Sequence, residues 1–155
     1  MLLSLTLSVG RTLMPEPLAT SLERVTAMMS TFGITLRIID SQRGIAMANL
    51  NGAEFVFMVL QSTLVIRSDR ALSGEIPALC IATNSVNNSA VLGSVTIVNR
   101  TTPPLLRAEV ENPCAAGLTD KQLRTVLETS INTVFKLFDA FDSATRSLTE
   151  NNALK

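Results

Sequence analysis

The sequence predicts an α+β domain in which an antiparallel β-sheet packs against three helices, the last of them long. Three segments carry apolar residues at steps of three and four, which indicates amphipathic helices. Between these segments the apolar residues alternate with a period of two, and an Asn-Gly pair at residues 51–52 marks a hairpin. Strands that occur in groups between helices are typical of a sheet with helices layered on one side.

The composition is that of one domain with few charges. A chain of 155 residues is long enough to bury a hydrophobic core of its own. Charged residues make up 17% of it, against about a quarter in ordinary soluble proteins, and the mean hydropathy is +0.33. We therefore expect part of the surface to be covered by a partner or by a second copy of the chain.

Several classes of function are excluded or disfavoured by what the sequence lacks. It has no histidine, so it cannot supply a Ser-His-Asp or Cys-His catalytic set or a His-ligated zinc site. Basic and acidic residues balance at 13 each and Tyr and Trp are absent, which disfavours nucleic acid as a partner. No apolar run approaches the roughly 18 residues of a transmembrane helix, so we expect no membrane partner. We also expect no enzyme activity, no cofactor and no metal.

Cys80 and Cys114 match no metal-binding spacing and no C-x-x-C motif. We expect two reduced, mostly buried thiols of a cytoplasmic protein. A disulfide or a reactive thiol is the alternative.

The chain divides into an N-terminal extension over residues 1–14, one domain over residues 15–145, and a tail over residues 146–155 that we expect to fray. The extension lacks the positive region and the cleavage site of a signal peptide. Its apolar residues alternate with Ser and Thr, as in an edge strand that contacts another chain (Leu3, Leu5, Leu7 and Val9). The alternative is an upstream extension, because Met14 would make a natural start.

A first helix is expected after Pro15 and Pro17, with Gly33 in a position suited to its C-terminal cap. Its apolar face has helical spacing (Leu18, Leu22, Val25, Met29 and Phe32).

Four strands should follow as an antiparallel meander. They cover residues 34–38, 45–50, 54–60 and 63–67, and Asn51-Gly52 suits a type I′ turn between the second and the third. Residues 54–60 are apolar on both faces, so we expect this strand to be central and covered on two sides.

The second half should contain a polar turn, a short helix and two more strands. The turn covers residues 68–77, the helix residues 78–89, and the strands residues 91–98 and 106–110. Asn112-Pro113 should end the last strand.

The long helix, over residues 117–141, has the clearest signals. Thr119 and Gln122 have the spacing of a capping box, and Leu118 and Leu123 that of a hydrophobic staple. One apolar stripe follows its length and needs a broad apolar surface opposite it (Leu123, Val126, Leu127, Ile131, Val134, Phe135, Phe138 and Phe141).

In this order the elements resemble the bacterial YbjN domain, over about residues 18–141. The resemblance rests on the N-x-x-N motif Asn84-Ser85-Val86-Asn87 in the second helix, on the hairpin after it, and on Gly117-Leu118-Thr119 at the start of the last helix. The chain departs from the family where Val86 replaces a frequent aromatic residue and Asn88-Ser89-Ala90-Val91 replaces a usually basic, Trp-containing stretch.

The resemblance implies the fold of type III secretion chaperones, which are commonly dimeric. It also implies a role in binding protein or in regulating a signalling pathway, since members are mostly described as sensory transduction regulators. Fold alone does not determine function.

Asn84 and Asn87 are candidate partner contacts, together with the apolar residues of the extension (Leu3, Leu5 and Leu7). The alternative is that the two asparagines bond backbone groups where the helix meets the hairpin, as Asn does near helix ends.

Two acidic pairs have spacings that could be drawn as an acid–base pair or a metal site: Asp139 with Asp142, and Glu109 with Glu111. We expect them to be solvated charges, because the first pair lies near the end of a helix and the second on the polar face of a strand.

Three hypotheses about function follow. The first is a homodimeric protein-binding module, chaperone-like or a regulatory adaptor, that holds an extended segment of its partner across an apolar face or a sheet edge. The second is a small regulatory domain that senses a small-molecule ligand. The third, an enzyme, has no set of residues to support it.

Overall fold

The computed structural model describes residues 13–154, and within them it contains one antiparallel sheet and three helices. The strands lie in the order β1-β2-β3-β4-β6-β5. The predicted α+β class is confirmed, whereas Leu3, Leu5 and Leu7 lie outside the described residues. In chain order the elements are α1 (Leu22–Thr31), β1 (Arg37–Asp40), β2 (Ile45–Leu50), β3 (Ala53–Val59), β4 (Thr63–Ala71), α2 (Ile76–Ser89), β5 (Ser94–Val98), β6 (Leu105–Pro113) and α3 (Asp120–Ala153).

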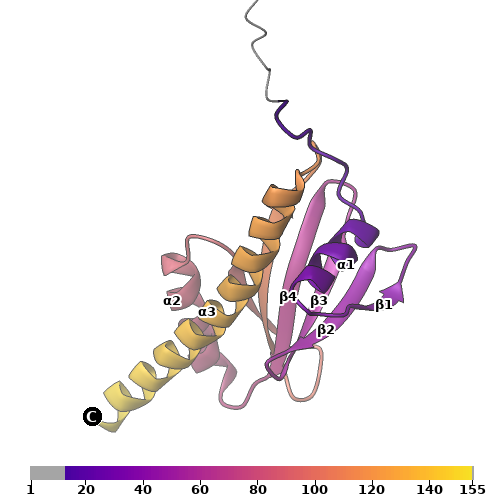
Figure 1. The fold of residues 1–155 in the computed structure, drawn as a ribbon. Helices are drawn as coiled ribbons and strands as arrows, with labels where there is room; N and C mark the ends of the chain where they lie inside the picture. Colours follow the sequence, from indigo (N-terminus) through magenta and orange to yellow (C-terminus); the bar gives the residue numbers. More distant parts are fainter. Residues whose placement is uncertain (1–12, 155) are drawn as a thin grey trace, which may run out of the picture.

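The helices all lie on one face of the sheet. α3 crosses β4 and β6, α1 lies beside the first half of α3, and α2 packs between α3 and β5 (Figure 1). Val25 of α1, Val86 of α2 and Leu127 of α3 belong to the same buried core as the helix-facing side chains of the sheet. The core is therefore one layer between the helices and the sheet.

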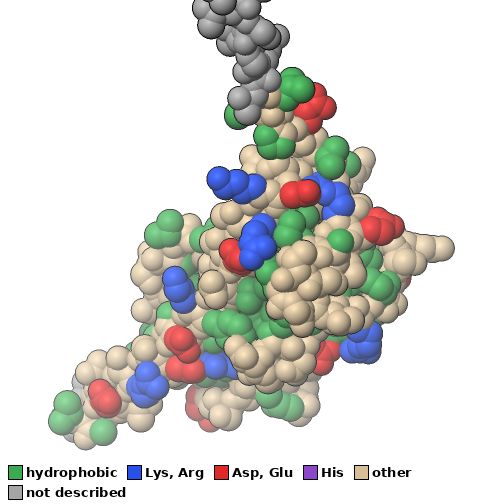
Figure 2. Space-filling view, in the orientation of Figure 1, with side chains coloured by type: hydrophobic (Ala, Val, Ile, Leu, Met, Phe, Trp, Pro, Cys, Tyr) green, Lys and Arg blue, Asp and Glu red, His purple; other side chains and the backbone are tan. Residues whose placement is uncertain are grey.

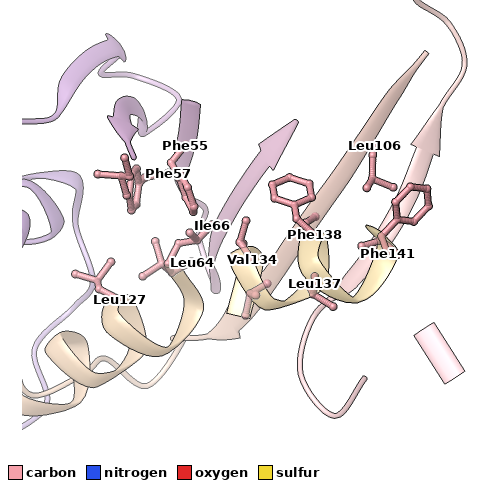
Figure 3. Close-up of a cluster of buried hydrophobic side chains, with 14 of the residues drawn as sticks. Phe55, Phe57, Leu64, Ile66, Leu106, Leu127, Val134, Leu137, Phe138 and Phe141 are labelled. Atoms are coloured by element: carbon pink, nitrogen blue, oxygen red, sulfur yellow. The ribbon is translucent and has the colours of Figure 1, made fainter. Parts of the chain in front are cut away.

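The long helix supplies much of that core, as its apolar stripe predicts. Side chains of α3 point toward those of β3, β4 and β6 (Figure 3). The ring of Phe135 lies 5.2 Å from that of Phe55, measured between centroids. The capping box is also present, because Thr119 accepts a hydrogen bond from the N–H of Gln122 and the side chain of Gln122 accepts one from the N–H of Thr119.

α3 does not end near Phe141 but continues to Ala153. Fraying of its last turns stays a prediction. Ala144 and Leu148 pack against the core and extend the apolar stripe by two more turns. The residues around them are mostly polar, so the apolar spacing that predicts a helix is weak in this part of the sequence.

The starts of α1 and α3 are tied to the segment before α1. Leu18 and Leu118 exchange two backbone hydrogen bonds, of 3.1 and 2.9 Å. The guanidinium of Arg24 donates to both of their carbonyl oxygens and pairs with Asp120. Gly117 is required there, because its φ is +78° and an added Cβ would lie 2.6 Å from the carbonyl oxygen of Leu18. Leu18 thus forms an isolated β-bridge with Leu118 and is not part of a helix. α1 begins later than predicted, at Leu22, with Ser21 as its N-cap.

The predicted meander of β1 to β4 is confirmed, and Asn51 and Gly52 have the positive φ values of a type I′ turn. Several boundaries were wrong. β1 begins at Arg37 rather than at residue 34, α2 begins at Ile76, and β5 begins at Ser94.

The largest boundary errors concern β4 and β6, which are both nine residues long. β4 continues through residues predicted as a turn, and β6 continues through Asn112 to Pro113, which were predicted to stop it. The two strands pair along their whole length, so partners across the sheet compensate for residues of low strand propensity.

A candidate protein-interaction surface

One face of the sheet is not covered by any helix of the described chain. Side chains alternate between the two faces of a strand, so the neighbours of helix-facing residues such as Phe57 and Ile66 point the other way. We call the apolar group in the middle of this side the open-face patch (Ile45, Met47, Val56, Met58 and Val65).

The open-face patch corrects the prediction that residues 54–60 form a strand covered on both sides. Phe55 and Phe57 of β3 are fully buried beneath the helices, whereas Val56 and Met58 on the other face are half-buried. Val65 is only 5% exposed, but it does not belong to the core between the helices and the sheet. β3 is therefore central in the sheet, and the described helices cover it on one side only.

Paired charges border the open-face patch. Arg107 donates two hydrogen bonds of 2.8 Å to Asp69, and Arg67 lies 3.8 Å from Glu109. The hydrogen bond to Asp69 raises the pKa of Arg107 above its ordinary value, against the lowering effect of partial burial. An apolar centre with a charged border is the usual anatomy of a protein–protein interface.

The two edges of the sheet differ in whether their backbone groups are free to pair with another strand. On β5, the side-chain amide of Asn87 donates to the carbonyl oxygen of Val95 at 2.9 Å and accepts from its N–H at 2.8 Å. The N–H and C=O of one strand residue point to the same side, so these groups of Val95 face away from β6. Asn87 therefore occupies the outer edge of β5 as a neighbouring strand would.

On β1, the outer edge has no neighbour among the described residues. Beside it, between α1 and β1, lies a groove of about 410 Å³ with a mainly apolar lining, which we call the α1–β1 groove (Leu22, Glu23, Thr26, Ala27, Ile38 and Ser41). Ile38 is 46% exposed in it. Figure 2 shows the helix-bearing side, on which acidic and basic side chains are interspersed rather than gathered by sign.

A second cavity, of about 510 Å³, lies between the β4–α2 connection and the last turns of α3. Arg70 stands in its wall, forms a bidentate ion pair with Asp142, and places its guanidinium carbon 4.8 Å from the ring centroid of Phe138. Glu75 and Thr149 add polar groups to a lining that also contains Leu and Phe. Its volume lies in the range of small-molecule pockets, although its lining is more polar than is usual for them.

The sequence-predicted candidates lie apart from one another. Asn84 is exposed on α2, whereas Asn87 holds Val95, which is the alternative use foreseen for these asparagines. Asp139 is exposed while Asp142 pairs with Arg70, and Glu109 pairs with Arg67 while Glu111 is exposed. Two of the four acidic residues are thus ion-paired rather than simply solvated.

Cys80 is exposed and Cys114 is buried, and the two are not bonded to each other. The prediction that both are mostly buried was wrong for Cys80. Within residues 13–154, no cluster of three or more Cys, Asp or Glu side chains could hold a metal ion. The helices in the same range are too short or too polar to cross a membrane.

The predicted turn over residues 68–77 is wrong for residues 68–71, which belong to β4, and for this reason Arg70 and the ion pair of Asp69 with Arg107 are not among the sequence-predicted candidates. A signal was present. Arg67 and Asp69 alternate with Ser68 and Arg70 as strand residues do, and they are opposite in charge to Glu109 and Arg107, which they face.

Comparisons with known proteins agree on a family. A family model described as "YbjN: Putative bacterial sensory transduction regulator" matches residues 21–143. The crystal structure of YbjN, described as a putative transcription regulator from E. coli, is similar with a TM-score of 0.68 at 12% sequence identity, over 79% of this chain and 91% of that one. A search of curated proteins found no match. With its model matched over most of the sequence, the chain belongs to the YbjN family.

Proposed function

We propose that this chain is a non-enzymatic protein-binding module, chaperone-like or a regulatory adaptor, in a bacterial signalling pathway. The observation that carries the proposal is the open-face patch, an apolar area on a sheet face that no described helix covers. Met47 and Met58 lie within it, and methionine side chains adapt to partners of different shape. The family description, a regulator of sensory transduction, is consistent with this role.

We further propose that the protein works as a homodimer in the cytoplasm, without nucleic acid, membrane or cofactor. The low content of charged residues, 17%, supports a surface that a second copy of the chain covers, since a monomer of this size would ordinarily carry more charge. The unbonded cysteines, one of them exposed, support a reducing compartment.

Affinity capture from a bacterial lysate with quantitative mass spectrometry tests the binding role. Wild-type protein and a Met47→Glu/Met58→Glu variant are used as baits, with Ile81→Glu on the exposed side of α2 as the matched control. We expect the wild type and the control to retain the same proteins and the double variant to lose them. Retention by all three baits would contradict a role for the open-face patch, and circular dichroism checks that each bait is folded.

A sensor of small-molecule ligands is the second candidate function. The cavity beside Arg70 favours it, because a cation stacked on aromatic rings next to Glu75 and Asp142 offers both signs of charge in about 510 Å³. A thermal-shift screen over metabolites and nucleotides tests it. A hit is expected to disappear in Asn152→Trp, which would fill the cavity from the exposed last turns of α3. An empty screen removes this candidate.

A further inference from the structure

The sheet can be extended by another strand on one side more readily than on the other. Asn87 occupies the backbone groups of Val95 on the β5 edge, whereas the β1 edge has no described neighbour. An unpaired edge exposes N–H and C=O groups that bind an added strand. Because β1 has only four residues, backbone pairing alone would supply few hydrogen bonds, and side-chain contacts have to contribute as well.

The α1–β1 groove offers those contacts. Leu22 and Ala27 form one wall and Ile38 the other, so a strand added beside β1 would bury every second side chain between them. α1 is ten residues long, or about 15 Å at 1.5 Å per residue. Side chains on one face of a strand are roughly 7 Å apart, so this length receives two or three of them.

The extension of the chain has the matching pattern. In an extended conformation Leu3, Leu5, Leu7 and Val9 would share one face, because they alternate with Ser and Thr, and this pattern suits an apolar groove on one side and solvent on the other. This segment carries no charge, so nothing in it repels Glu23 at the groove.

Residues 13–17, which precede the bridge at Leu18, do not run along the α1–β1 groove of their own chain. Arg24 and Leu118 hold Leu18 in place, and residues 13–17 before it extend outward from the body of the protein (Figure 1). Leu13 and Met14 are each 86% exposed. Pro15 and Pro17 fix φ near −65° and hold this stretch extended, which disfavours a turn back onto the same chain.

We infer that residues 3–9 of one copy pair with β1 of a second copy, with their Leu and Val side chains in the α1–β1 groove, and that the exchange is reciprocal. The inference rests on the homodimer proposed above and names the segment and the groove that form it. The two junctions are identical, as in other two-fold symmetric dimers.

Light scattering coupled to size-exclusion chromatography tests this with the full chain at micromolar concentration. The segment variant is Leu3→Asp/Leu5→Asp/Leu7→Asp, and its matched control is Ser4→Asp/Thr6→Asp/Ser8→Asp, at the alternate positions that the inference turns toward solvent. The groove variant is Ala27→Asp/Ile38→Asp, both at exposed positions, so folding should persist. We expect twice the monomer mass for the wild type and the control, and the 16.7 kDa monomer for the segment and groove variants.

Mixing the segment variant with the groove variant provides a second readout. The first retains an intact groove and the second an intact segment, so one of the two junctions can form and a mixed dimer should appear. No other dimer interface predicts this complementation.

Three results would overturn the inference. A wild-type monomer rules out the exchange and the homodimer together. A dimer that survives both the segment and the groove variants rules out the exchange alone. A dimer that is lost only in Met47→Glu/Met58→Glu also rules out the exchange, and it would show that the homodimer forms through the open-face patch.

Discussion

Replacing Asn87 by Ala should destabilise the fold by removing the contact that occupies the outer edge of β5. Two hydrogen bonds join the side-chain amide to Val95, at 2.9 and 2.8 Å. A hydrogen bond contributes about 0.5–1.5 kcal/mol net, so their loss costs about 1–3 kcal/mol. Alanine is the better helix former by up to about 0.7 kcal/mol, which offsets part of that cost.

Asn84→Ala is the matched control, because Asn84 is exposed on the same helix and forms no side-chain hydrogen bond with the described residues. This substitution should show only the gain in helix propensity. The difference between the two variants therefore isolates the contact with Val95, and we expect it to be about 1–3 kcal/mol.

Urea unfolding of both variants, followed by circular dichroism, measures the difference from the midpoints at a shared slope. Hydrogen exchange adds a local readout, since the amide of Val95 should lose protection in Asn87→Ala and keep it in Asn84→Ala. Equal midpoints together with unchanged exchange at Val95 would refute the assignment of Asn87 to the strand edge.

Three further substitutions test the fold around α3. Thr119→Ala should cost about 1 kcal/mol in urea unfolding through loss of the N-cap, and an unchanged midpoint would contradict the capping box. Phe138→Ala should cost about 3–5 kcal/mol because its side chain is buried against the sheet. If the thermal midpoint of Phe138→Ala falls by less than that of Thr119→Ala, the prediction that Phe138 belongs to the core is wrong. Gly117→Ala should cost about 1 kcal/mol or more, through its positive φ and the close approach of Leu18, and a more stable variant would show that the segment before α1 can move.

Local signals in the sequence predicted most of the fold. The capping box at Thr119 and the turn at Asn51 depend on a few neighbouring residues, and both are present as expected. Boundaries failed where distant pairing decides the structure. Asn112 continues β6 because it lies opposite Leu64 and donates to Ser130 of α3, and neither partner is close in sequence.

The candidate site was less predictable than the fold. A run of apolar residues such as Val56 to Met58 shows that both faces of a strand are apolar, but it does not show whether a second layer covers them. For Asn87, the sequence left partner contact and backbone bonding both open, since an amide serves either purpose. The hydrogen bonds to Val95 show the use of the amide within the fold, and contact of Asn84 or of residues 3–7 with a partner stays a prediction.

The occupied edge at Val95 has a consequence for assembly. Sheets of many molecules can join edge to edge into a fibre only if each molecule has two unpaired sheet edges that can pair with each other. Here the amide of Asn87 occupies the outward backbone groups of Val95 on one of the two edges. The apolar sheet face that no described residue covers therefore does not by itself make this protein a template for unlimited strand-by-strand polymerisation.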